Sequence, residues 1–177
     1  TARNMEVYGP LLEAVFRRDG IPAYISRRSD ILEKPVLTML LSAVDAVTGG
    51  FEYEDVFRCL KTGMAGVSMA ECDILENYVI RWEIRGAMWL RDTDWTASPD
   101  GYGAELNDTR RQRLAEVNTV RRRVRELFAD LSEGLKTGLT IRDKAETLYR
   151  FAESAAVPET LKQQTEALYD DGQVQLA

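Results

Sequence analysis

The residues best suited to chemistry in this sequence are seven arginines that gather within residues 110–125. They are Arg110, Arg111, Arg113, Arg121, Arg122, Arg123 and Arg125. The same stretch contains one acidic residue, Glu116. Guanidinium groups form paired hydrogen bonds with phosphates and carboxylates. The segment therefore suits a helix that binds a phosphate backbone or an acidic protein surface.

A helical projection places part of this arginine set on one flank of the helix. With 100° per residue and Val117 at zero, the apolar residues fall between about −80° and +60°. Our candidate contact residues for nucleic acid or a partner fall between about +80° and +140°. They are Arg111, Asn118, Arg122 and Arg125.

The alternative is a solvated helix face whose guanidinium groups pair with acids elsewhere in the fold. Residues 110–125 carry a net charge of +6 within a chain of −6, so the remaining residues carry −12. Because that excess supplies many carboxylates, the composition favours internal pairing over an external contact.

Composition and motifs exclude several classes of enzyme. The 177 residues include no His, which removes Ser-His and Cys-His nucleophiles and His-ligated metals. Cys59 and Cys72 are too few for a four-thiolate cluster. The sequence has no phosphate-binding glycine loop and no Gly-x-Ser-x-Gly elbow. We therefore expect no catalytic, cofactor-binding or metal-binding residue in this chain, and an independent small enzyme is the least favoured hypothesis.

Two further groups of side chains have weaker claims to function. Asp92 and Asp94 lack the glycine and final glutamate of a calcium loop, so they indicate a solvated surface. Residues 84–103 combine glycines, a proline and aromatics, which predicts a loop. Its tryptophans, with Trp82 and Tyr102, could stack on bases. Such aromatics more often hold a long loop against a helical body.

Helical periodicity dominates the chain and predicts a mainly α fold, an irregular bundle of six or seven helices. The longest helix should run from about 104 to 132, end at Gly134 and Gly138, and carry the arginines. Its predicted buried stripe is Leu114, Val117, Val120, Val124, Leu127, Phe128 and Leu131.

Local signals predict the ends of other elements. The pairs Ser68–Glu71 and Thr140–Asp143 are typical of helix N-termini. Residues 21–25 predict one short strand, which would form a small α/β segment at the N-terminus. A single strand cannot form a sheet, so we expect its partners in sequence outside this chain.

Residues 3–25 resemble a segment of superfamily 1 helicases. In those proteins an Arg-x-Asn element precedes a helix, followed by Gly-Ile-Pro-Tyr and a short strand. Here the first element reads Ala-Arg-Asn, and Ala23 intervenes before Tyr24. Residues 31–45 resemble the helix that leads into the inserted 2B subdomain of these helicases.

Three stretches resemble one branch of these proteins more specifically. Residues 48–63, 73–79 and 84–89 are similar to AddB, the B subunit of the bacterial ATP-dependent helicase–nuclease AddAB. The helical tail from Leu106 is similar in pattern but less diagnostic. The resemblance implies the end of a 2A-like subdomain over residues 1–34 and a helical 2B-like subdomain over residues 35–177.

The same resemblance implies a role in processing double-strand DNA ends for recombinational repair in the bacterial cytoplasm. The implied partners are an AddA-type helicase–nuclease subunit, in a heterodimer, and DNA. The family uses ATP, magnesium and an iron–sulfur cluster, but none of those parts maps onto this chain. Cys59 and Cys72 lack the spacing of the cluster ligands.

The implied function is therefore that of a non-catalytic internal segment that contributes DNA or subunit contacts. The alternative is a protein-interaction helical module that docks on an acidic partner through the arginine-rich helix face. No membrane association is expected, because no stretch approaches the ~20 apolar residues that span a bilayer.

Overall fold

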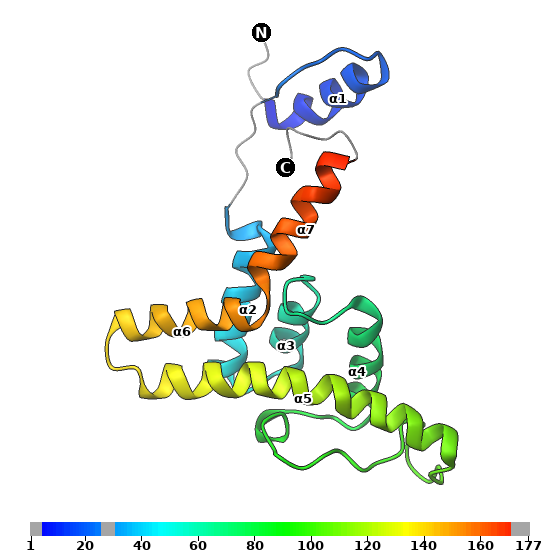
Figure 1. The fold of residues 1–177 in the computed structure, drawn as a ribbon. Coiled ribbons are helices and arrows are strands. Elements are labelled where there is room, and N and C mark those ends of the chain that lie inside the picture. Colours follow the sequence, from blue (N-terminus) through cyan, green and yellow to red (C-terminus); the bar gives the residue numbers. More distant parts are fainter. Residues whose placement is uncertain (1–4, 26–30, 171–177) are drawn as a thin grey trace. The chain divides into compact units, whose positions relative to one another are not determined.

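The computed structural model of the chain describes residues 5–25 and 31–170. The chain divides into two compact units, residues 1–34 and 35–177. The first contains α1 (Met5–Arg18) and the short turn η1 (Ile31–Glu33). The second contains α2 (Pro35–Gly49), α3 (Tyr53–Leu60), α4 (Met69–Arg81), η2 (Gly86–Met88), α5 (Asp108–Thr137), α6 (Ile141–Ser154) and α7 (Val157–Asp170) (Figure 1). The predicted mainly α fold is confirmed. None of the described helices is long and apolar enough to cross a membrane.

In the first unit, α1 ends at a glycine with a left-handed backbone. Gly20 has φ of 66°, and the Ile21 amide donates to the Phe16 carbonyl at 2.8 Å. Residues 21–25 are irregular rather than a strand, so the described residues do not form the predicted α/β segment. A strand needs a neighbour for its backbone donors and acceptors, and the described part of this unit supplies none.

In the second unit, α5 is the element against which the others pack. It contacts α2, α4 and α6, and Figure 1 shows it lying across the ends of α2, α3 and α4. Its apolar stripe is buried as predicted, apart from half-buried Leu114. The Phe128 ring lies 5.8 Å from the Phe51 ring and 6.2 Å from the Phe151 ring, which joins α5 to the loop after α2 and to α6.

Both predicted helix N-termini are confirmed. The Ser68 hydroxyl accepts from the Glu71 amide, and the Glu71 carboxylate accepts from the Ser68 amide at 2.9 Å. Thr140 and Asp143 make the same reciprocal pair at the start of α6. These side chains satisfy amide groups that have no partner within their own helices.

The predicted end of α5 at Gly134 is wrong, because the helix continues to Thr137 and is capped by Gly138. Gly134 instead permits a close helix crossing. A Cβ atom at this position would lie 2.6 Å from Thr147 Oγ1 on α6, and closer still to Thr147 Cγ2. The glycine is therefore required by the packing of α6, which runs back along the C-terminal part of α5 (Figure 1).

This crossing predicts that Gly134→Ala destabilises the protein. Glycine to alanine inside a helix normally stabilises by about 1 kcal/mol. Overpacking costs about 1–3 kcal/mol, so we expect a net loss of up to about 2 kcal/mol in the free energy of unfolding, measured by urea denaturation. The double variant Gly134→Ala/Thr147→Ala should recover part of this loss, since it removes the two closest atoms and leaves the residue 147 Cβ, 3.1 Å from the new methyl group. Thr147→Ala alone is the control, and an additive double variant would contradict the proposed clash.

Candidate functional site on helix α5

Five of the seven arginines of α5 face a long loop that connects α4 to α5. This segment, residues 82–107, is called the α4–α5 loop below, and it lies alongside α5 (Figure 1). Each of the seven arginines has an acidic partner within 4 Å. Three loop carboxylates, those of Asp92, Asp94 and Asp100, pair with five of them. The positive charge of α5 is therefore largely used to hold its own neighbouring loop.

Two of the predicted contact residues bind the middle of this loop. Arg122 donates from Nε and Nη2 to the two carboxylate oxygens of Asp94, at 3.0 and 2.8 Å. Arg125 donates from Nε to the Leu90 carbonyl at 3.2 Å, and its Nη2 lies 2.8 Å from Asp92 Oδ1. A paired guanidinium–carboxylate contact fixes both distance and orientation.

The third predicted contact residue, Asn118, is buried and bonded at both polar atoms. Its Oδ1 accepts from the Trp95 amide at 2.9 Å, and its Nδ2 donates to the Trp95 carbonyl at 2.9 Å. The side chain thus replaces a backbone partner for an irregular loop residue. It has no polar atom left for DNA or for a partner.

Arg121 has the most demanding position of the set, since its side chain has an exposed fraction of 0%. Its Nη2 donates to the Arg91 carbonyl, its guanidinium lies 5.1 Å from the Trp95 ring, and its Nη1 is 3.8 Å from Asp94 Oδ1. Nε and Nη1 have no hydrogen-bond partner. Burial lowers the pKa of this guanidinium below its ordinary value.

Sequence reasoning missed the role of Arg121, although the helical projection contained the signal. Four residues after Val117, it lies about 40° from that residue and so within the apolar arc. An arginine in that arc must bury its guanidinium group or distort the helix packing.

The tryptophans anchor the α4–α5 loop rather than presenting rings to solvent. Trp89 and Trp95 are buried, and the Trp95 ring stacks on Tyr78 with centroids 5.1 Å apart and planes 1° apart. Trp82 donates from Nε1 to the Ser98 carbonyl at 3.0 Å. Of the four aromatics considered for base stacking, Tyr102 alone is fully available, with an exposed fraction of 98%.

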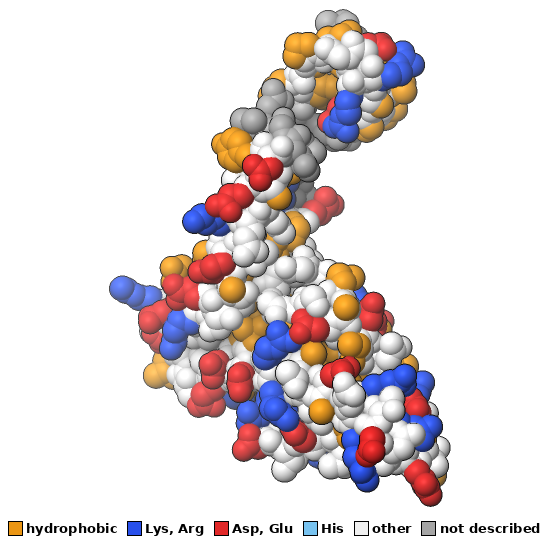
Figure 2. All heavy atoms as spheres, turned by 45° about the vertical axis from the view of Figure 1, so that its right-hand side comes forward, with side chains coloured by type: hydrophobic (Ala, Val, Ile, Leu, Met, Phe, Trp, Pro, Cys, Tyr) orange, Lys and Arg blue, Asp and Glu red, His pale blue; other side chains and the backbone are white. Residues whose placement is uncertain are grey.

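Arg111 is the predicted contact residue that is freest to meet an external group. Its Nη1 lies 3.3 Å from Asp108, one turn earlier on the same helix, and its side chain is 67% exposed. Such a local, solvent-exposed pair contributes little to stability and is readily exchanged. Figure 2 shows acidic and basic side chains intermingled on the visible face of this unit rather than a continuous basic surface.

The two cysteines do not fit a catalytic or cluster-binding role. Cys59 on α3 and Cys72 on α4 are buried and unpaired by a disulfide. Burial raises the pKa of the Cys59 thiol to about 12 and also raises that of Cys72, so both stay protonated at neutral pH. No group of three or more His, Cys, Asp or Glu able to hold a metal is found in residues 5–25 and 31–170.

Comparison with known proteins identifies relatives along nearly the whole chain. Three of them are each named as the B subunit of an ATP-dependent helicase/deoxyribonuclease, and they come from Acetivibrio thermocellus, Clostridium botulinum (strain Loch Maree / Type A3) and Ruminiclostridium cellulolyticum. Identity is 31–32% over 175–179 residues, which is 98–99% of this chain. The chain spans about 15% of the length of these curated relatives. No family model matches the chain.

The two hydrogen bonds between the Asn118 side chain and the Trp95 backbone predict that Asn118→Ala frees the middle of the α4–α5 loop. Removing both bonds leaves the Trp95 amide and carbonyl unsatisfied, which costs about 1–3 kcal/mol in the free energy of unfolding. Hydrogen exchange of the Trp95 amide should also become faster. The matched control is Asn77→Ala, since Asn77 is exposed on α4. Unchanged exchange at Trp95 in Asn118→Ala would show that this pair does not hold the loop.

The loop carboxylates predict a loss of stability in acid. Hydrogen bonds from Arg122 and Arg110 lower the pKa values of Asp94 and Asp100 below their ordinary value of 3.8. A lowered folded-state pKa contributes stability that is complete above the ordinary value and is lost as pH falls through the lowered one. The stability deficit of Asp94→Asn relative to wild type should therefore be full at pH 6 and shrink below pH 3.8.

Urea denaturation between pH 2.5 and 6 measures this difference. Asp73→Asn is the control, because Asp73 is an exposed acid on α4. Its stability relative to wild type is measured over the same range. A deficit of Asp94→Asn that stays constant over this range would contradict the linkage.

Proposed function

The chain is homologous over 98% of its length to one segment of the B subunit of ATP-dependent helicase/deoxyribonucleases, and from this premise we propose that it is a helical, non-catalytic part of such a subunit. The observation that carries the proposal is the continuous similarity, which includes both units of the chain. Hydrolysis of ATP and of DNA would then belong to other parts of the assembly.

The proposed setting is the processing of double-strand DNA ends for recombinational repair in the bacterial cytoplasm. An AddA-type subunit would be the partner, and the 2A-like and 2B-like identities of residues 1–34 and 35–177 are part of the same proposal. ATP, magnesium and an iron–sulfur cluster would be held elsewhere in the complex. The buried, protonated thiols of this chain support that division of roles.

Within this setting, we place the external contact at the N-terminal part of α5. Arg111 and Arg113 are both at least 60% exposed at their side chains, and each pairs with an acid at 3.3–3.4 Å. Arg122 and Arg125 also reach the surface but hold Asp94 and Asp92. To contact DNA, these two arginines would have to use donors that their loop carboxylates leave free. Otherwise they would have to exchange the carboxylate for a phosphate.

Charge reversal at Arg111 tests this proposal without disturbing the loop. We expect Arg111→Glu, in the full-length subunit within its complex, to weaken DNA binding severalfold at low salt and to reduce the salt dependence by about one phosphate contact. The matched control is Arg142→Glu, the same charge change at an exposed site on α6. DNA affinity is measured by fluorescence anisotropy over a range of salt concentrations.

Association of the two subunits is measured in parallel. If Arg111→Glu weakens subunit association and leaves DNA affinity intact, the flank is a protein interface, as in the alternative hypothesis. If both quantities match the Arg142→Glu control, the flank makes no contact in the complex and this part of the proposal fails.

A further inference from the structure

We infer that the tip of the α4–α5 loop binds single-stranded DNA, with Tyr102 stacking on an unpaired base and neighbouring guanidinium groups holding the adjacent phosphates. The inference rests on the proposed function, because it assumes that this chain meets DNA. Beyond the proposed function, it names a specific site, the loop tip at Tyr102, and the form of DNA bound there, a single strand. It is carried by the combination of one fully exposed ring, an anchored loop and an excess of guanidinium groups.

Tyr102 is exposed in a way that internal packing does not explain. Its ring is 98% exposed, between Gly101 with φ of 105° and Gly103 with φ of 76°. These left-handed glycine conformations are strained for other residues and project the intervening ring from the loop. A tyrosine presents a large apolar face at a low cost in side-chain entropy when it binds a flat partner.

The loop beneath this ring is fixed rather than loose. The Gly101 amide donates to the Ser98 carbonyl at 3.1 Å, and Arg81 Nη1 donates to the Pro99 carbonyl at 2.8 Å. The Arg81 stem also packs against Gly101, where an added Cβ would lie 3.4 Å from Arg81 Cδ. The backbone that carries the ring is thus held in place before any ligand binds, which reduces the ordering cost of binding.

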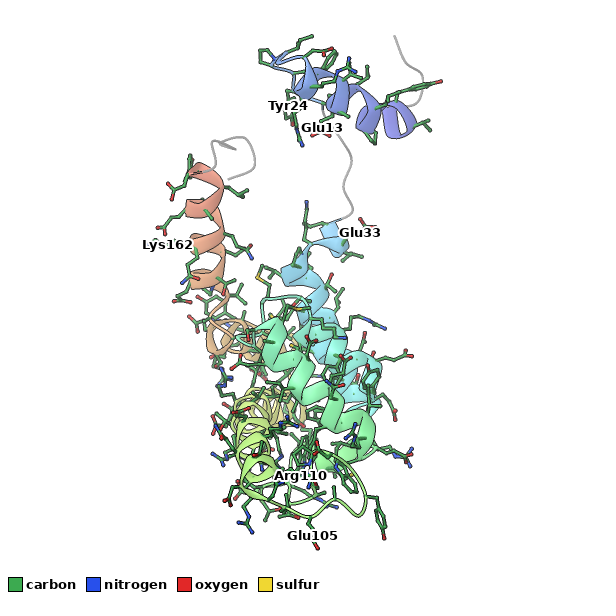
Figure 3. The ribbon with its side chains drawn as sticks, turned by 90° about the vertical axis from the view of Figure 1, so that its right-hand side faces the viewer. Glu13, Tyr24, Glu33, Glu105, Arg110 and Lys162 are labelled. Carbon is green, nitrogen blue, oxygen red and sulfur yellow. The ribbon has the colours of Figure 1, made fainter. Side chains whose placement is uncertain are left out.

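Three guanidinium groups surround this loop tip, and one carboxylate lies among them. Asp100 accepts from Arg110 Nε at 2.6 Å and from Arg113 Nη1 at 3.4 Å, and Arg81 is close enough to lower the pKa of Asp100 further. Each guanidinium carries five N–H donors, so Arg81 and Arg113 retain donors for a phosphate. The Glu105 side chain lies at the same end of the bundle and points outward from it (Figure 3).

The surroundings of Tyr102 favour an unpaired base over a protein surface. Within the α4–α5 loop, residues 82–107, all of them described, Tyr102 is the one large apolar side chain that is exposed, and Ile80 on α4 is the next exposed one before it along the chain. Protein interfaces usually have an apolar centre of several residues. A single ring beside guanidinium groups matches the stacking and phosphate contacts of single-strand binding. Bases within a duplex are already stacked, so the ring could insert between them only by unstacking them.

Photocrosslinking in the intact complex tests the site directly. The probe is single-stranded DNA that carries 5-iodouracil, which crosslinks to aromatic side chains stacked on it, and crosslinked peptides are mapped by mass spectrometry. We expect a crosslink at Tyr102 that Tyr102→Ala abolishes and Tyr102→Phe retains. We also expect Tyr102→Ala to weaken single-strand binding by about tenfold, from the usual contribution of one stacked base. Tyr149→Ala, a 64% exposed tyrosine on α6, is the control.

Asp100→Asn adds a test with the opposite sign. It releases Arg110 and Arg113 from their carboxylate, so single-strand affinity should rise severalfold and depend more steeply on salt. If the cluster only supports the loop, the variant leaves single-strand affinity unchanged or lowers it, and the phosphate part of the inference fails.

The failure of this inference is distinguishable from that of the proposed function. Crosslinks elsewhere in this chain, with none at Tyr102, would overturn the inference and leave the proposed function standing. Crosslinks confined to other parts of the complex, together with an Arg111→Glu variant that matches its control, would overturn both this inference and the external contact proposed for α5. A Tyr102→Ala variant that loses subunit association but keeps the single-strand affinity of the wild type would assign the loop tip to a protein interface. That result would also overturn the inference.

Discussion

The second unit depends on the pairing of a strongly basic helix with the loop that precedes it. Arg121 makes this pairing obligatory, because its guanidinium is wholly buried against Trp95 and the Arg91 carbonyl. A buried charge that loses its partners is far more costly than a buried pair that keeps them. Asp94, Trp95 and the loop carbonyls therefore have to remain in place whenever α5 is packed, and the loop is ordered although it lacks regular secondary structure over most of its length.

This dependence changes how the charge of α5 bears on function. A net charge of +6 over residues 110–125 is typical of a polyanion-binding helix. Here the same charge first neutralises Asp92, Asp94 and Asp100 of its own loop. What an external ligand can use is the remainder, which consists of exposed guanidinium donors at the N-terminal part of α5. The number of donors open to a ligand depends on which arginines can exchange their acidic partner for another one. The net charge of the segment does not contain this information.

The sequence was sufficient to predict the helices, because helical spacing of apolar residues and capping pairs are local signals. Ser68 with Glu71 and Thr140 with Asp143 act within one turn of helix, and both were predicted correctly. The predictions failed where the deciding atom lies on another element. The sequence pattern predicts a helix end at Gly134, whereas its contact with Thr147 on α6 explains the glycine. Asn118 was placed on a contact flank, whereas its amide binds Trp95, which lies 23 positions earlier. The strand expected at residues 21–25 likewise needed a partner that the described residues do not provide.

The two ends of α5 differ in the balance of forces that holds them. Its 30 residues extend over about 45 Å. In the N-terminal half, ion pairs and hydrogen bonds to the α4–α5 loop, which salt and acid weaken, add to the burial of Val117 and Val120. At the C-terminal end the contact is a close crossing of Gly134 with Thr147 and the packing of Phe128 with Phe151, which salt barely affects. A polyanion that engages the loop tip would therefore alter the electrostatic end of the helix while the packed end stays attached to α6.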